Sequence, residues 1–199
     1  MEESLYTQPQ VIRRIIQAGQ NRVGMPVLNY ILLGMMAGGA ISFGAAASSV
    51  AAHNIVDFGI SRLVTGLVFP VGLMMIVLVG GELFTGDCLM VMGVWDKKYS
   101  FGSMFRTLLI ILLSNLAGSL LFAFMISYSG IFSYSDGALG AYMIKIAYGK
   151  CTISPVRAFC SGMLCNILVC SAVLIANSAK DVIGRIAGIF FPIMAFVVG

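Results

Sequence analysis

The stretch LVTGLVFPVGLMMIVLVGGELFTGDCLMVMGVW, residues 63–95, is apolar enough to cross a membrane but too long to do so as one straight helix. Such a helix would measure roughly 50 Å, whereas the hydrocarbon core of a bilayer is about 30 Å thick. Its middle reads GGELFTGD, residues 80–87, with three glycines and two carboxylates. Backbone that leaves a helix at membrane depth must be buried in protein or line a cavity, because lipid offers it no hydrogen bonds. Breaks of this kind recur in channels and transporters, so the stretch predicts a permeation protein.

The composition of the whole chain indicates an integral membrane protein built from helices. Hydrophobic residues make up 59% and charged residues 10% of the 199 positions, and the mean hydropathy is +0.99. Soluble domains carry about 25% charged residues. The apolar runs are long, unlike the short alternating segments of a transmembrane barrel. The net charge of +4 is spread thinly along the chain, which excludes nucleic acid as a partner.

The apolar runs predict five membrane segments after a short surface helix. In residues 9–23, aliphatic side chains fall near one helical face and the arginines fall largely elsewhere, which suits an amphipathic helix lying on the membrane. We therefore expect an N-terminal amphipathic segment at 1–26 and a single transmembrane channel domain at 27–199. Its segments are expected at 27–52, 63–95, 104–128, 156–176 and 186–199, with loops at 53–62 and 177–185 and a short helix at 138–148. In the first segment, Gly34-xxx-Gly38 and Ala40-xxx-Gly44 would let other helices approach closely.

The fifth segment echoes the second. Phe69-Pro70 opens one and Phe191-Pro192 opens the other, while LGMM at 33–36 is matched by SGML at 161–164. An odd number of crossings separates the copies, so the repeat would be inverted, with a binding site at the interface of its halves. Residues 186–199 are too few to span a bilayer, so we expect the chain to end inside a membrane segment of a longer protein.

The basic residues predict the orientation in the membrane. With the N-terminus inside, eight lysines and arginines lie inside and four outside, which the positive-inside rule favours. The inner set is Arg13, Arg14, Arg22, Lys97, Lys98, Arg106, Lys180 and Arg185, and the outer set is Arg62, Lys145, Lys150 and Arg157. The expected location is the inner or plasma membrane of the cell, crossed several times, with a cytoplasmic N-terminus.

The break contains the first candidates for a functional site. Carboxylates inside a membrane segment are functional candidates, although acids at a helix break can also simply cap free N–H groups. Leu83 and Phe84 could narrow a pore, since an apolar constriction can gate by dewetting. Thr85 supplies a hydroxyl for an anion or a proton carrier. The loop itself is expected to be built by Gly80, Gly81, Glu82, Gly86 and Asp87.

Other polar residues lie outside the break. Lys150 either concentrates anions at a vestibule or snorkels at the interface. Asn166, in the middle of the fourth segment, either bonds to another helix or faces the pore. His53 has no partners at metal-ligand spacing, and the five cysteines contain no CxxC pair, so no metal site and no cofactor are expected. The chain has no nucleotide-binding loop and no nucleophile motif, and we expect it not to be an enzyme.

The combination of GGELFTGD, the FP dipeptide fourteen residues before Leu83, and SGMLCNILVCSAVLIA at 161–176 resembles the formate/nitrite transporter family. The resemblance extends over essentially the whole chain. It implies an all-α integral membrane protein with an aquaporin-like inverted repeat, six helical segments, and broken second and fifth transmembrane helices. It also implies a homopentamer with one pore per protomer and a small anion, formate, nitrite or hydrosulfide, as substrate.

The same resemblance implies roles for individual residues. Leu83, Phe84 and Thr85 would form the inner part of the pore. Phe69 and Leu73 would line its constrictions, Lys150 would be the vestibule lysine, and Phe196 would be the pore-facing aromatic of the fifth segment. The family's histidine, in an FEH motif, and its sixth helix would fall beyond Gly199. That histidine could protonate the anion in transit, so transport could be proton-linked.

Three functional hypotheses follow. The chain is a channel or transporter for small monovalent anions, with formate favoured, or a membrane redox enzyme that uses its cysteines, or a membrane anchor for a soluble partner. An enzyme would need a ligand set that the sequence lacks. An anchor would tolerate substitution of Thr85 and of the loop glycines. The sequence favours the channel.

Overall fold

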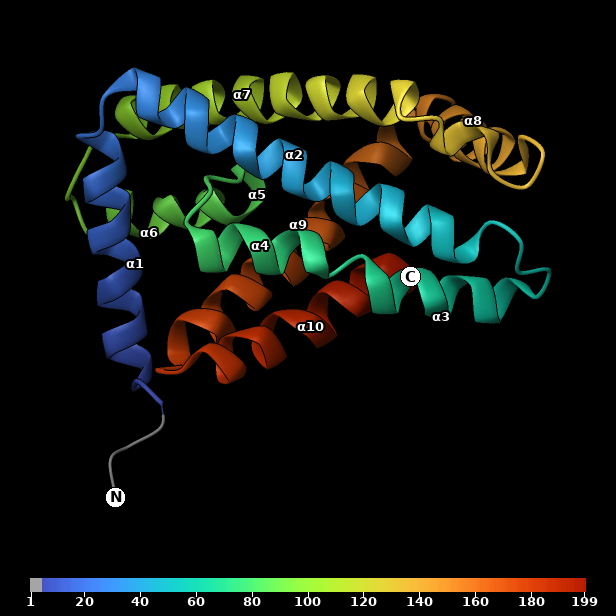
Figure 1. Ribbon diagram of the computed structural model, residues 1–199. Helices are drawn as coiled ribbons and strands as arrows, with labels where there is room; N and C mark the ends of the chain where they lie inside the picture. The colour runs from blue at the N-terminus through green and yellow to red at the C-terminus, as the bar shows by residue number, and fades with distance from the viewer. Residues whose placement is uncertain (1–4) are drawn as a thin grey trace.

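The computed structural model describes residues 5–199, and within them the secondary structure is helical, apart from one isolated bridge between Leu5 and Ala179. Figure 1 shows the elements in chain order. They are α1 (Gln8–Val23), α2 (Val27–Ala52), α3 (Phe58–Val68), α4 (Val71–Val79), α5 (Phe84–Asp87), η1 (Cys88–Met90), α6 (Val91–Trp95), α7 (Phe101–Tyr128), η2 (Ile131–Ser133), α8 (Ala138–Cys151), α9 (Pro155–Ser178) and α10 (Val182–Val198).

Four helical stretches are long and apolar enough to cross a membrane, namely α2, α3–α4 together, α7 and α9. They share one general direction in Figure 1, where α1 crosses one end of the bundle. The α6–α7 and α9–α10 connectors lie at that same end, and α8 and the α2–α3 connector lie at the other. The first segment coincides with the predicted range 27–52. The ranges 104–128 and 156–176 fall within α7 and α9, and α8 contains the short helix expected at 138–148.

The expected loops at 53–62 and 177–185 are too long, because an aspartate starts the next helix earlier. The Asp57 carboxylate accepts a hydrogen bond of 2.8 Å from the backbone N–H of Ile60, so α3 begins at Phe58. The Asp181 carboxylate accepts one of 2.7 Å from Gly184, so α10 begins at Val182. Aspartate is a strong N-cap because its side chain satisfies an N–H group that the first turn leaves free.

The helix of the second segment ends in the middle of the bundle. It is divided into α3 and α4 at Phe69-Pro70, and it ends at Gly80. The φ of Gly80 is 99°, a left-handed value that suits glycine. The N–H groups of Gly80 and Gly81 both donate to the Ile76 carbonyl, at 2.9 Å each. Residues 80–83 form a loop, and a new helix begins at Phe84. In Figure 1 this loop turns from the end of α4 toward α5, after which the chain continues toward α1.

Unlike the second segment, the fifth segment contains no interruption within the described residues. Helix α10 runs without interruption from Val182 to Val198, with Pro192 inside it. A break in the fifth segment and an inverted repeat therefore stay predictions from the sequence.

The N-terminal helix packs on protein. Residues 1–4 of the expected segment 1–26 lie outside the described residues, and α1 occupies Gln8–Val23. Val11 and Ile15 are buried with Leu89, and side chains of α9 pack against them. The apolar face that the sequence pattern directed toward lipid thus meets the end of the helix bundle, while Ile12 remains exposed.

Small residues bring α2 into close contact with two neighbours. A Cβ added at Gly34 would lie 2.6 Å from the Ser114 Cβ on α7, and one added at Gly118 would lie 2.6 Å from the Met35 Cα. On the other side, a Cβ at Gly44 would lie 2.8 Å from the Phe69 carbonyl oxygen. Real Cβ atoms do not approach so closely, so both small-residue pairs expected in the first segment lie in tight helix–helix contacts.

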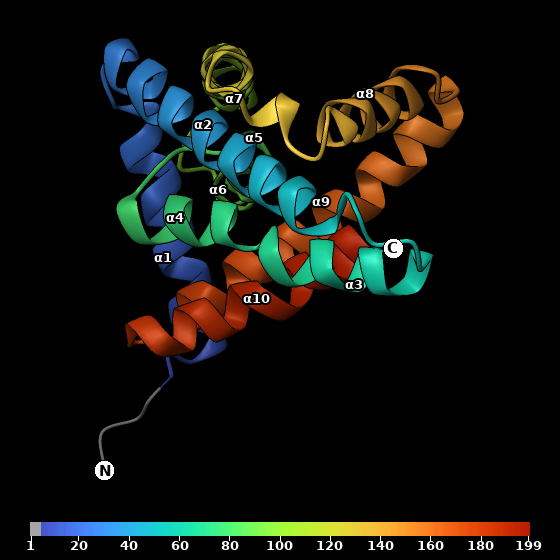
Figure 2. The ribbon, with the colours of Figure 1, turned by 45° about the vertical axis from the view of Figure 1, so that its right-hand side comes forward.

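The main buried cluster joins four helices around the interrupted segment. It consists of Ala37, Ala40, Leu73, Ile76, Val169, Ala172, Ala176, Ile189 and Ile193, from α2, α4, α9 and α10. Figure 2 shows α10 running below α4 and passing behind α3. This arrangement places the loop after α4 among α2, α7, α9 and α10.

We predict that Gly118→Ala destabilises the protein by about 1–3 kcal/mol, because the added methyl overpacks the contact between α7 and α2. Thermal unfolding in detergent measures the change. Ala117→Val is the matched control, since Ala117 directly precedes Gly118 and is exposed. An equal shift for both variants would contradict a tight α2–α7 contact.

Candidate functional site

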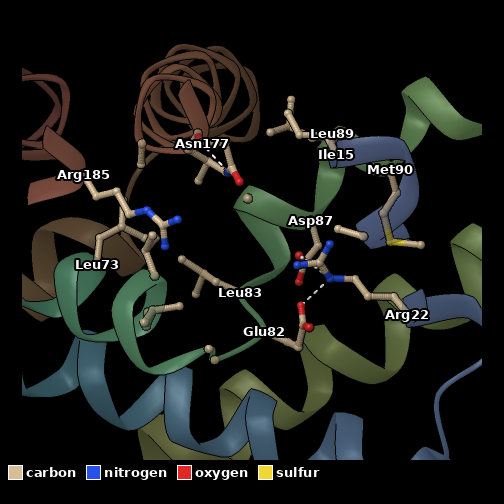
Figure 3. Close-up of a pocket in the computed structure, with 18 residues that line it drawn as sticks. Ile15, Arg22, Leu73, Glu82, Leu83, Asp87, Leu89, Met90, Asn177 and Arg185 are labelled. Carbon is tan, nitrogen blue, oxygen red and sulfur yellow. Dashed lines mark hydrogen bonds and ion pairs between the residues drawn. The ribbon is translucent and has the colours of Figure 1, made fainter. Parts of the chain in front are cut away.

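A cavity of about 240 Å³ lies beside the interrupted helix. Figure 3 shows the lining side chains, which come from the end of α4, the loop, α5, η1, α1, α9 and α10. They are Ile15, Ala18, Arg22, Leu73, Ile76, Val77, Gly80, Gly81, Glu82, Leu83, Gly86, Asp87, Leu89, Met90, Val173, Ala176, Asn177 and Arg185. The break in the second segment therefore opens onto a cavity with both apolar and charged walls.

Asn115 of α7 provides the hydrogen bonds that the loop backbone lacks. Its Nδ2 donates to the carbonyls of Gly34 and Glu82, each at 2.9 Å, and its Oδ1 accepts from the Phe84 N–H at 3.0 Å. The Glu82 N–H donates to the Leu33 carbonyl at 3.3 Å. One buried amide thus joins α2, α7 and both sides of the loop, which is what backbone at membrane depth requires.

Glu82 of the loop and Asp87 of α5 share one arginine, Arg22 of α1. Nε of Arg22 lies 2.5 Å from Oε2 of Glu82 and 3.2 Å from Oδ1 of Asp87. The Glu82 and Asp87 side chains are 8% and 6% exposed, so their charges depend on this partner. The Tyr30 hydroxyl donates to the Arg22 carbonyl and fixes the end of α1.

The charge state of Arg22 follows from this environment. Burial lowers the pKa of its guanidinium, but the Asp87 and Glu82 carboxylates outweigh that effect and keep the pKa above its usual value. Arg22 is therefore a permanent cation between α1 and the loop.

The opposite wall of the cavity is apolar. Leu73 is 2% exposed in the main buried cluster, and Leu83 packs against that cluster from the loop. Figure 3 shows the Leu83 side chain directed into the cavity. One helical turn before Leu73, the rings of Phe69 and Phe196 meet edge-on with centroids 6.1 Å apart. Packed apolar side chains thus continue from the cavity to the contact of α3 and α10.

A second cation and an amide complete the lining. Arg185, in the first turn of α10, has its buried Nε without a hydrogen-bond partner. Asn177, at the end of α9, donates from Nδ2 to the Val173 carbonyl at 2.8 Å. Figure 3 shows both side chains on the side of Leu83 opposite Arg22.

Comparison with known proteins decides the family. A family model described as Formate/nitrite transporter matches residues 9–199. The chain belongs to this family. A probable formate transporter of Methanothermobacter thermautotrophicus is 36% identical over 190 residues, which cover 86% of this chain and 69% of that relative. The formate channel BtFdhC of Bacillus thuringiensis is 33% identical over 192 residues, covering 95% of this chain and 73% of that protein.

Solved structures agree with the formate/nitrite transporter assignment. A pentameric formate channel with formate bound superimposes with a TM-score of 0.78 at 28% identity, over 86% of this chain and 68% of that one. An FNT family ion channel superimposes with a TM-score of 0.85 at 26% identity, over 96% and 76%. The resemblance seen in the sequence is confirmed, and so is an all-α fold of the membrane-channel type.

The structure brings only part of the predicted site together. Leu73 and Leu83 line the cavity, together with Gly80, Gly81 and Glu82 of the loop. Gly86 and Asp87 also line it, but they lie in helix α5 and not in the loop, because the new helix already begins at Phe84. Phe84 and Thr85 are absent from the lining; Phe84 packs near Met90 and Met104, and the Thr85 carbonyl accepts from the Cys170 thiol at 3.4 Å. Pore roles for these two residues stay predictions.

The remaining candidates lie away from the cavity. Phe69 and Phe196 form the ring pair described above. Lys150 is exposed near the end of α8, at the opposite end of the bundle from α1. Asn166 has its buried Oδ1 without a partner within the described residues. Its two expected roles, bonding to another helix or facing a pore, both stay open. His53 contacts Ser135 through Nε2 at 2.9 Å, which ties the end of α2 to the loop before α8.

Sequence reasoning missed Arg22, Asn115, Asn177 and Arg185 as parts of the site. Arg22 was expected on the polar face of a surface helix, and nothing in the periodicity of 9–23 marks it as the partner of Glu82. Asn115 carried one signal, since it is an amide in the middle of an apolar segment, as Asn166 is. A search for polar residues at the centres of spans would have found it.

We predict that Arg22→Gln lowers the free energy of unfolding by about 3 kcal/mol, because two buried carboxylates lose their cation. Adding Glu82→Gln should recover part of the loss, since one of those charges is then removed. Thermal unfolding of the detergent-solubilised protein measures both effects. Arg13→Gln is the control, because Arg13 is exposed and makes no ion pair within residues 5–199. Equal losses in both arginine variants would refute the role of Arg22.

Proposed function

We propose that the protein is a transmembrane channel for small monovalent anions, with formate as the favoured substrate and nitrite or hydrosulfide as alternatives. The observation that carries this proposal is the helix interrupted at residues 80–83, whose loop is hydrogen-bonded and opens onto a cavity that Leu73 and Leu83 help to line. The names of the relatives support formate. No catalytic step is proposed.

The proposed route passes through the protomer along the interrupted segment. An anion entering at the end that carries α8 meets Lys150, passes the ring pair of Phe69 and Phe196, and continues along Leu73 to Leu83. It leaves through the cavity beside α1. Phe84, Thr85 and Asn166 would complete the lining in the conducting state. The route combines cationic mouths with an apolar middle.

The apolar middle limits the rate by desolvation. Removing an ion from water costs several kcal/mol after relaxation of the surroundings. A short apolar section keeps that cost tolerable for a small anion, and positive charge at the mouths raises its local concentration. A hydrophobic constriction also gates by dewetting, so the volume of Leu83 controls the closed state.

We predict that Leu83→Ala raises anion leak severalfold, because the cavity joins the apolar section when that side chain is removed. Thr85→Val should reduce flux, because it deletes a hydroxyl at nearly constant volume. Stopped-flow uptake into proteoliposomes measures both effects. Leu78→Ala is the matched control, since Leu78 is exposed on the outer face of α4. If neither loop variant changes conductance or selectivity in a folded oligomer, the loop does not line a pore and an anchoring role becomes the better account.

We further propose a homopentamer in the cell membrane with α1 on the cytoplasmic side. The homologous pentameric formate channel supports the assembly. The orientation is supported by the eight-to-four division of basic residues, because α1, the Lys97-Lys98 connector and the Lys180 connector lie at one end of the bundle.

In a variant whose native cysteines are replaced by alanine, we predict that Lys98→Cys is protected from an impermeant thiol reagent outside intact cells. Lys145→Cys should be labelled under the same conditions, because it lies on α8 at the other end. Both lysines are exposed, so burial does not explain a difference. The reverse labelling pattern would invert the proposed topology.

A further inference from the structure

Arg185 differs from the other charged residues of the cavity because no carboxylate within residues 5–199 pairs with it. Arg22, Glu82 and Asp87 neutralise one another in part across distances of 2.5 and 3.2 Å. Within residues 5–199 no carboxylate lies within 4.0 Å of Arg185, and its buried Nε has no hydrogen-bond partner. A buried donor without a partner costs free energy, most of all in a charged group. The cavity therefore contains an arginine that residues 5–199 leave without an ion-pair partner and without a hydrogen-bond partner at Nε.

Asn177 supplies a neutral donor next to this arginine. Its Nδ2 uses one N–H group on the Val173 carbonyl, which holds the amide at the end of α9 and leaves a second N–H group for a ligand. Figure 3 shows Arg185 and Asn177 facing the same part of the cavity, with Leu83 below them. Asn177 lies on α9 and Arg185 on α10, so two helices bring these donors to one part of the cavity.

The charge distribution favours an anion at this position over one near Glu82 and Asp87. At Glu82 and Asp87 the Arg22 guanidinium is already occupied by two acidic side chains, so it is not free to bind a further anion. Leu83 and the cavity space separate that cluster from Arg185 in Figure 3. The nearby acids also weaken binding at Arg185. A conduction site needs that balance, because the ion must enter and then leave.

We propose that Arg185 and Asn177 form an anion-binding subsite in the cavity, at the end of the bundle that α1 crosses, and that the guanidinium of Arg185 makes it selective for planar anions with two oxygens. This inference rests on the proposed function, since it names the residues that select the substrate. A guanidinium presents parallel N–H donors that match a carboxylate in a bidentate way, whereas an ammonium acts as a point charge. Formate and nitrite satisfy both donors, but hydrosulfide satisfies one.

Uptake into proteoliposomes containing the full chain tests this proposal, with formate and hydrosulfide compared over a range of concentrations. Arg185→Lys keeps the charge and removes the planar fork, so the half-saturating formate concentration should rise about tenfold. The value for hydrosulfide should change little. Arg185→Gln should weaken both anions. Arg106→Lys is the matched control, because Arg106 is exposed at the start of α7 and does not line the cavity.

A second variant keeps the test independent of the folding of the Arg185 variants. Asn177→Asp places a carboxylate beside Arg185, so it should abolish saturable formate uptake, whereas Asn177→Ser should have a mild effect. An unchanged formate-to-hydrosulfide ratio in Arg185→Lys, or normal uptake in Asn177→Asp, would overturn the subsite while leaving the channel intact. No anion uptake by the wild-type protein would instead overturn the proposed function.

Discussion

A chain that leaves its helix inside a membrane has to find partners for its free N–H and C=O groups within the protein. Here the Asn115 amide does this for the loop after α4, with bonds of 2.9 to 3.0 Å to Gly34, Glu82 and Phe84. The glycine contacts between α2 and α7 bring Asn115 within reach of the loop. The position of Leu83, the opening of the cavity and the pairing of Arg22 with its two acids all depend on this arrangement.

The cavity separates two kinds of electrostatic environment. On one side, Glu82 and Asp87 hold Arg22 and thereby attach the surface helix α1 to the loop. On the other, Arg185 has no counter-charge in the described part of the chain. Leu83 stands between them. A paired cluster stabilises structure, whereas an unpaired cation attracts a ligand, so the two arginines of one cavity have different consequences for function.

The sequence was sufficient for local features and insufficient for contacts between distant segments. Long apolar runs and the glycines at 80–81 reveal the spans and the interruption, because length and backbone freedom are local properties. The caps at Asp57 and Asp181 were equally local and were overlooked. Arg22 and Glu82 are 60 residues apart, and Asn115 and Gly34 are 81 apart, so no periodicity reveals their contact. Periodicity gives the face of a helix on which a side chain lies, but its partner depends on tertiary packing. Pore roles for Lys150 and Phe196 are predicted only from the family resemblance.

The central claim is that the interrupted second segment makes the protomer a pore for formate-like anions. The most direct measurement is uptake of formate, nitrite and hydrosulfide, compared side by side, by liposomes that contain the purified wild-type protein. The account predicts uptake well above that of protein-free liposomes, with formate favoured. Uptake of all three anions equal to that of protein-free liposomes, by a protein that remains helical and oligomeric, would contradict it.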